Sequence, residues 1–124
     1  MELEFLKICE YFDMILKNRK YQIIGKDKGL STILIGIAED GQMFWLDTEE
    51  EIAIYIACNL EVFKKELYWF SIFTEKYPQN PSEYMLIKRA NAFRKELFCL
   101  DNNAFSDDEN YWAEVAEEME YGII

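Results

Sequence analysis

Carboxylates are the main chemically active side chains of this 124-residue sequence, which contains 24 Asp and Glu residues and no histidine. Two carboxylates could serve as the acid and base of a glycosidase, or bind a divalent metal ion. Four acids stand close together at Asp47, Glu49, Glu50 and Glu51. Successive acids on a turn point apart into water, whereas such chemistry requires acids that converge in an enclosed pocket. We therefore expect a protein that is not an enzyme, with no catalytic residue, cofactor or metal ion.

The three cysteines, Cys9, Cys58 and Cys99, are far apart and form no Cys-x-x-Cys pair. Without histidine, the chain has no Ser-His or Cys-His pair for nucleophilic catalysis. We expect the cysteines to be small buried hydrophobic residues of a protein in a reducing compartment.

Length and hydropathy predict a single folded domain over residues 1–124. Hydrophobic residues make up 51% of the sequence, which is typical of a chain with a packed core. No apolar run approaches the roughly 20 residues of a membrane helix. The first four residues lack the basic region of a signal peptide. We therefore expect a cytoplasmic protein.

The formal net charge is −11, and the acids are concentrated in two segments. Residues 29–63 and 96–124 contain no Lys or Arg. A negative field of this kind repels nucleic acid and anionic membranes and attracts cationic partners. The alternative is that the charge only keeps the protein soluble.

The elements that would position these acids are predicted from apolar spacing. Helical spacing over residues 2–17 predicts a first amphipathic helix. A short strand at 21–24 precedes a flexible turn at 25–29. Alternating runs at 33–37 and 42–47 flank Asp40-Gly41, which predicts a two-residue hairpin loop with Ile37 facing Phe44 and Trp45 opposite Gly36. Residues 52–56 supply another strand.

Three helices are predicted after Leu60. The first is capped by Asn59 and ends at Tyr77-Pro78. The second runs from near Ser82 to about Phe98, and the third opens with a capping box at 106–109. The outward residues of the second are Lys88, Arg89, Arg94 and Lys95, and those of the third are Glu114, Glu117, Glu118 and Glu120. The predicted fold is α+β: an N-terminal helix, an antiparallel sheet of about four strands over 21–56, and three helices packed on or beside the sheet.

The strand-to-helix junction carries a family resemblance. It is written Ala57-Cys58-Asn59-Leu60-Glu61-Val62-Phe63 and follows a strand ending in Leu-Asp, an acidic turn and a third strand. This order resembles the SUKH superfamily, whose members often have Asn-Ser-Ser-Leu-Glu-x-Phe there. Ala57 and Cys58 depart from that pattern. A last helix with Trp112, a Glu-rich middle and Gly122 is also similar to the family.

The resemblance implies a bacterial immunity protein, a cytoplasmic antidote that binds a cognate polymorphic toxin. Together with the charge, it predicts a basic nuclease or other effector domain as the partner, with no nucleic acid and no membrane, and a monomer or homodimer. The predicted contact residues are Trp45 as aromatic anchor and the acids Asp47, Glu49, Glu50, Glu51, Glu114, Glu117 and Glu118. Two alternatives stay open: a non-enzymatic cytoplasmic adaptor of the same fold, and a homo-oligomer that uses the aromatic helix at 60–77.

Overall fold

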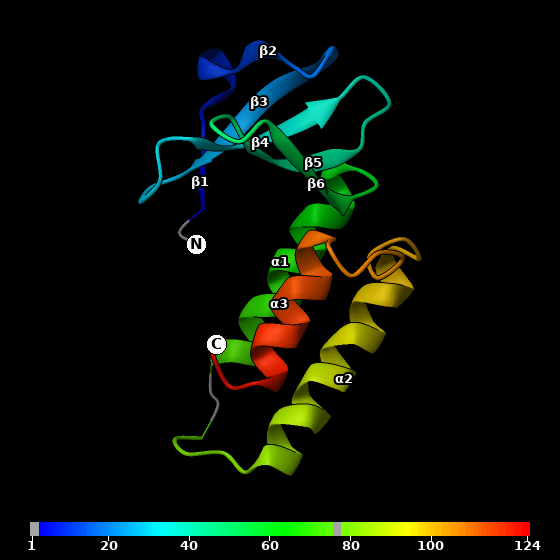
Figure 1. The fold of residues 1–124 in the computed structure, drawn as a ribbon. Coiled ribbons are helices and arrows are strands. Elements are labelled where there is room, and N and C mark those ends of the chain that lie inside the picture. Colours follow the sequence, from blue (N-terminus) through cyan, green and yellow to red (C-terminus); the bar gives the residue numbers. More distant parts are fainter. Residues whose placement is uncertain (1–2, 76–77) are drawn as a thin grey trace. The chain divides into compact units, whose positions relative to one another are not determined.

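An antiparallel sheet of six strands occupies the first half of the computed structural model, which describes residues 3–75 and 78–124 (Figure 1). The strands are β1 (Leu3–Phe5), β2 (Phe12–Leu16), β3 (Arg19–Asp27), β4 (Ile33–Ala38), β5 (Met43–Asp47) and β6 (Ile52–Ala57). Their order is β1-β3-β4-β5-β6, and β2 also pairs with β3. Three helices follow, so the predicted α+β class is confirmed.

The chain divides into two compact units. We call Met1–Leu60 the strand unit and Glu61–Ile124 the helical unit. The single domain expected from the sequence stays a prediction, as does the packing of the helices on the sheet. Among the described residues, no helix combines the length and apolar character needed to cross a membrane.

The N-terminal helix expected over residues 2–17 is wrong. The described part of this segment forms β1, a short 3₁₀ helix, η1 (Ile8–Glu10), and β2. Lys17 and Asn18 adopt positive φ angles of 48° and 65° and make a two-residue turn, so that β2 folds back on β3. Met14 and Leu16 then pack inward, while Ile15 is 71% exposed. The period of two therefore determines the structure here, not the helical spacing of the apolar residues.

The strand expected at 21–24 is longer than predicted, because β3 begins at Arg19 and extends to Asp27, into the segment expected to be a flexible turn. Gly25 lies inside this strand, where an added Cβ would approach the Glu4 carbonyl oxygen to 3.2 Å. The sheet therefore has six strands in place of about four, and it begins before Tyr21.

The β4–β5 hairpin has a different register from the predicted one. The Ala38 N–H donates to the Gln42 carbonyl, which leaves Glu39, Asp40 and Gly41 as a three-residue loop. Gly41 has a φ of +89°, as the left-handed position of such a loop requires. Phe44 consequently pairs with Gly36, not with Ile37, and Trp45 pairs with Ile35, not with Gly36. A slip of one residue moves each side chain of a strand to the opposite face relative to its neighbours.

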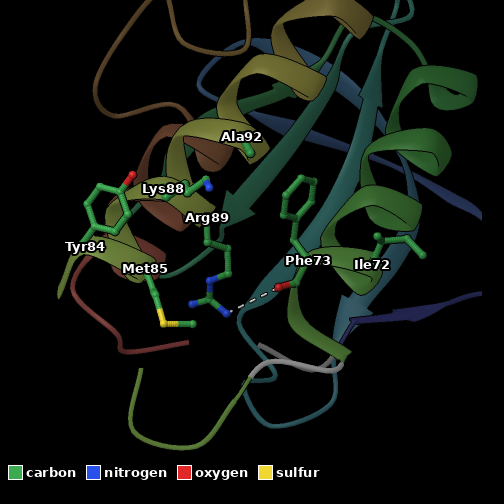
Figure 2. A pocket seen from close by; sticks show the side chains of 7 residues that line it. All are labelled: Ile72, Phe73, Tyr84, Met85, Lys88, Arg89 and Ala92. Carbon is green, nitrogen blue, oxygen red and sulfur yellow. Dashed lines mark hydrogen bonds between the residues drawn. The ribbon is translucent and has the colours of Figure 1, made fainter. Parts of the chain in front are cut away.

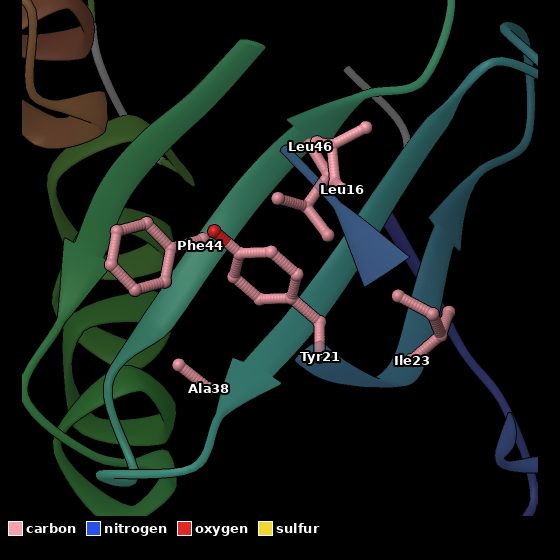
Figure 3. Close-up of a cluster of buried hydrophobic side chains, with 6 residues drawn as sticks. All are labelled: Leu16, Tyr21, Ile23, Ala38, Phe44 and Leu46. Carbon is pink, nitrogen blue, oxygen red and sulfur yellow. The ribbon is translucent and has the colours of Figure 1, made fainter. Parts of the chain in front are cut away.

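The core of the strand unit is an apolar cluster on one face of the sheet. Figure 3 shows it around the Tyr21 and Phe44 rings, whose centroids are 5.7 Å apart in an edge-to-face arrangement. The buried members are Leu16, Tyr21, Ile23, Ala38, Phe44 and Leu46. Gly36 lies beneath them, since a Cβ there would meet Leu46 Cδ1 at 2.9 Å and Tyr21 Cβ at 3.0 Å.

The helical unit contains α1 (Leu60–Glu75), α2 (Glu83–Leu100) and α3 (Tyr111–Glu120). Three aromatic rings, one from each helix, form its centre. The ring centroids of Phe70 and Trp112 are 5.8 Å apart, and those of Phe93 and Trp112 are 5.7 Å apart. These contacts fix α1, α2 and α3 against one another within the unit. The end predicted for the first helix at Tyr77 lies outside the described residues.

The helix ends were predicted with mixed success. The Ser82 hydroxyl accepts a hydrogen bond from the Met85 N–H at 3.1 Å, which confirms the predicted start of α2. Gly122, with a φ of +74°, ends α3 as predicted; the N–H groups of Gly122 and Ile123 donate to the carbonyls of Met119 and Glu118. The capping box at 106–109 is wrong, because α3 begins only at Tyr111.

Candidate functional site

An acidic surface lies on the exposed side of α3. Glu114, Glu117 and Glu118 are all exposed, and they line a shallow hollow of about 210 Å³ together with Tyr121 and Ile123. Spacings of three and four residues place these glutamates on neighbouring turns of one helix face. The structure thus brings together the three C-terminal acids that the sequence predicted as contact residues. We call them the α3 acidic surface.

The carboxylates of the α3 acidic surface repel one another. Partial burial raises the pKa of Glu114, and the negative charges of Glu118, Glu109 and Glu117 raise it further. A raised pKa next to like charges indicates a region of concentrated negative potential. A cationic group that approached this surface would relieve the repulsion.

Glu120 does not belong to this surface. Its Oε1 accepts a hydrogen bond from Arg94 Nη1 at 3.1 Å, so an ion pair from α2 neutralises it. Of these four glutamates of α3, one is therefore held in an ion pair and three are exposed.

The second group of predicted acids lies in the strand unit, at the turn between β5 and β6. Asp47 is half-buried, and its Oδ1 accepts hydrogen bonds from the N–H groups of Glu49 and Glu50 at 3.0 and 3.1 Å. Glu49, Glu50 and Glu51 are exposed, and Glu51 has a φ of 55°. Asp47 thus stabilises the turn, while the three glutamates point into solvent. The two predicted acidic groups belong to different units.

Trp45 is half-buried on β5. Its neighbours across the strands are Ile35 on β4 and Ile54 on β6, so it lies on the sheet face opposite the cluster of Phe44 and Leu46. The sequence predicted that Trp45 lies opposite Gly36, and the observed pairing with Ile35 corrects this. The assignment of Trp45 as a partner anchor stays a prediction.

Glu66 of α1 is a buried acid that was not predicted from the sequence. Its side chain is 0% exposed, and neither carboxylate oxygen has a hydrogen-bond partner. Burial raises its pKa to about 8; the indole of Trp112 opposes this shift, and the charge of Asp101 adds to it. The indole N–H of Trp112 nevertheless makes no hydrogen bond to the Glu66 carboxyl group. Glu66 is therefore protonated in the folded protein at neutral pH, and no substrate can reach it without local opening.

The apolar spacing of α1 could have predicted that Glu66 is buried. The apolar residues Phe63, Phe70 and Phe73 define one helix face, and position 66 lies on that face at a spacing of three from Phe63 and four from Phe70. An acid at such a position is a candidate buried carboxyl, even though it interrupts the apolar stripe.

Arg89 was predicted to point outward and is instead buried, with 7% exposure. Its guanidinium donates to the carbonyl oxygens of Phe73, Met119 and Ile124. Phe73 and Met119 lie in the last turns of α1 and α3, where carbonyls lack partners within the helix and a cation is stabilised. Arg89 therefore joins the carboxyl ends of two helices.

The cysteine prediction is partly wrong, because Cys9 and Cys99 are exposed. Within residues 3–75 and 78–124, no cluster of three Cys, Asp or Glu side chains is arranged to hold a metal ion. No protein-family model, no curated protein and no solved structure matches the chain.

Proposed function

We propose that this chain is a non-enzymatic immunity protein of the SUKH type, which neutralises a cognate toxin by binding it one to one. The observation that carries the proposal is the α3 acidic surface, where Glu114, Glu117 and Glu118 are exposed and mutual repulsion helps to raise the pKa of Glu114. A partner that brings Lys or Arg side chains to this surface gains Coulomb attraction at three positions. An effector domain that grips phosphate presents such side chains.

The turn between β5 and β6 supports the same proposal. Glu49, Glu50 and Glu51 add three exposed negative charges, and the turn backbone that carries them is held by Asp47. Charges held on a fixed turn contribute mainly to the rate and specificity of association. Trp45, which lies on the strand leading into this turn, is proposed as the aromatic anchor beside the charged rim.

The first test is rescue of bacterial growth. The gene immediately upstream in the source genome is expressed in a test bacterium with and without this protein, and the surviving cells are counted. Rescue, with co-purification of a one-to-one complex, supports the antidote function. Absence of toxicity, or toxicity that this protein does not relieve, contradicts it and favours the adaptor alternative.

The role of the α3 acidic surface is tested by the triple substitution Glu114→Gln, Glu117→Gln and Glu118→Gln. Loss of three steering charges is expected to slow association with the toxin about tenfold at low salt. The matched control removes three exposed acids outside both predicted surfaces: Glu39→Gln, Glu75→Gln and Glu83→Gln. If both triple variants bind equally fast, net charge and not the α3 acidic surface governs association.

Salt dependence and Trp45→Ala complete the test. The wild-type association rate should fall as salt screens the exposed charges, and a rate that stays unchanged would refute steering. A Trp45→Ala protein that keeps its fold but binds weakly would identify an anchor. One that unfolds would make Trp45 a core residue.

A homo-oligomer remains the second candidate because of α1. Tyr68 and Ile72 of this helix are 59% and 47% exposed, although the neighbouring aromatic residues pack inside the unit. Light scattering at micromolar concentration distinguishes the two cases. A dimer that Tyr68→Ser and Ile72→Ser dissociate would establish the interface, whereas a monomeric mass would exclude it at that concentration.

A further inference from the structure

The helical unit contains an apolar groove between α1 and α2. Its volume is about 500 Å³, which is within the range of small-molecule sites. Its walls are formed by the residues drawn in Figure 2: Ile72, Phe73, Tyr84, Met85, Lys88, Arg89 and Ala92. Ile72, Tyr84 and Met85 remain 47%, 72% and 39% exposed, so a substantial apolar area is open to solvent here.

The charges of the groove are opposite in sign to those of the chain as a whole. The net charge of the chain is −11, yet the two charged residues among the described lining, Lys88 and Arg89, are both cations. The groove therefore favours an anion, in contrast to the α3 acidic surface.

The two cations have different positions. Arg89 is buried and donates to the Phe73 carbonyl, a bond that Figure 2 marks across the groove wall. Its guanidinium is therefore held in the wall by oxygens at helix ends. Lys88 is exposed, so its ammonium can meet the head group of a ligand.

We propose that this groove binds an amphipathic anion, an apolar chain ending in a carboxylate, with the chain against Ile72, Phe73 and Met85 and the carboxylate beside Lys88. Apolar walls that are open to water account for the chain, and the cationic lining accounts for the sign of the head group. The groove shares no lining residue with the α3 acidic surface, and the proposal is independent of the immunity function.

The probe is decanoate, titrated into the full-length protein by calorimetry below its micellar concentration. Saturable one-to-one binding is expected, together with shifts of the Met85 and Ile72 methyl signals in NMR spectra. Decyltrimethylammonium has the same tail with a cationic head and should bind at least tenfold more weakly. Equal binding of the two probes would show that only the apolar tail is recognised and would overturn the proposal.

Two substitutions locate the site. Lys88→Glu should weaken decanoate binding about five- to tenfold by replacing attraction with repulsion. Ala92→Phe should abolish it by filling the groove, and both positions are exposed, so the fold should be retained. Lys95→Glu is the matched control, because Lys95 is exposed on the same helix outside the groove lining. If Lys95→Glu weakens binding as much as Lys88→Glu does, the carboxylate has no specific position.

A second copy of the chain is the competing occupant. A wild-type dimer that Ala92→Phe converts to a monomer, without saturable decanoate binding, would assign the groove to self-association. A monomer that binds decanoate would assign it to the small ligand.

Discussion

The strand unit and the helical unit place their charged side chains differently. In the strand unit, Arg19 lies over the Phe44 ring at 4.6 Å and pairs with Asp40 at the surface. Asp27 is the one buried polar residue among the described residues of this unit. The described part of the helical unit buries four such side chains, namely Glu66, Arg89, Asp101 and Asn110.

Helix ends explain most of this difference. Strands satisfy their backbone groups by pairing, whereas each helix leaves terminal N–H and carbonyl groups that need other partners. Arg89 donates to carbonyls at two helix ends. Asp101 accepts the Asn103 N–H, and the Asn110 amide donates to the Asn103 carbonyl in the loop before α3. Glu66 has no such function, and it is the group whose burial should be most sensitive to pH.

The largest expected effect is therefore a pH dependence of stability that comes from Glu66. Its pKa is about 8 in the folded protein, against the ordinary value of 4.5 for a glutamate in water, which we take for the unfolded chain. Between these values the folded state holds a proton that the unfolded state has lost, so stability falls as pH rises. The free energy of unfolding should decrease by about 1.4 kcal/mol per pH unit over this window. Urea unfolding at several values from pH 5 to pH 8 measures the slope.

Glu66→Gln should remove this slope, because the amide is neutral throughout. The control is Glu61→Gln, an exposed position on the same helix, which should leave the slope as in wild type. A slope that persists in Glu66→Gln would mean that another group titrates, and the contrast between the two units would lose its main support.

In the strand unit, we expect tight packing of the core side chains, and not a buried ionisable group, to limit stability. Gly36→Ala inserts a Cβ at 2.9 Å from Leu46 Cδ1 and 3.0 Å from Tyr21 Cβ, which should cost about 2 kcal/mol of unfolding free energy. Gly29→Ala is the same chemical change at an exposed site, where the new Cβ would lie an ordinary 3.5 Å from Asp27 Oδ1. Denaturant unfolding of both variants at one pH makes the comparison. Similar losses in the two would contradict tight packing around Gly36.

Local sequence signals predicted the elements that have strong boundaries. Ser82 marked the start of α2 and Gly122 the end of α3, because each residue type satisfies a specific need of a helix terminus. The β4, β5 and β6 strands were found from apolar runs bounded by turn residues. Apolar spacing failed over residues 2–17, because Ile8 in η1 and Ile15 on β2 fit the spacing of a helical stripe although both are exposed.

Two features could not be predicted from local patterns: the register of the β4–β5 hairpin and the buried position of Arg89. The hairpin register depends on whether two or three residues form the loop, and Asp40-Gly41 is compatible with both. The α3 acidic surface is the contrasting case, because helical spacing alone places its three residues on one face. Arg89 was assigned to solvent because its partners are carbonyls of other helices, which a helix pattern does not reveal.

The smallest expected effect concerns Arg19. Arg19→Gln removes both its position over the Phe44 ring and its ion pair with Asp40 at 3.3 Å, and should cost about 1 kcal/mol. Asp40→Asn removes the ion pair alone, because asparagine keeps an oxygen for the Gln42 N–H, and should cost less. Lys26→Gln, at an exposed site on the same strand, is the control. If Asp40→Asn costs as much stability as Arg19→Gln, the contact of Arg19 with the Phe44 ring contributes nothing. A larger cost for Arg19→Gln would show that a surface cation stabilises the strand unit. If that cost is also constant from pH 5 to pH 8, this stabilisation lacks the pH dependence expected of the helical unit.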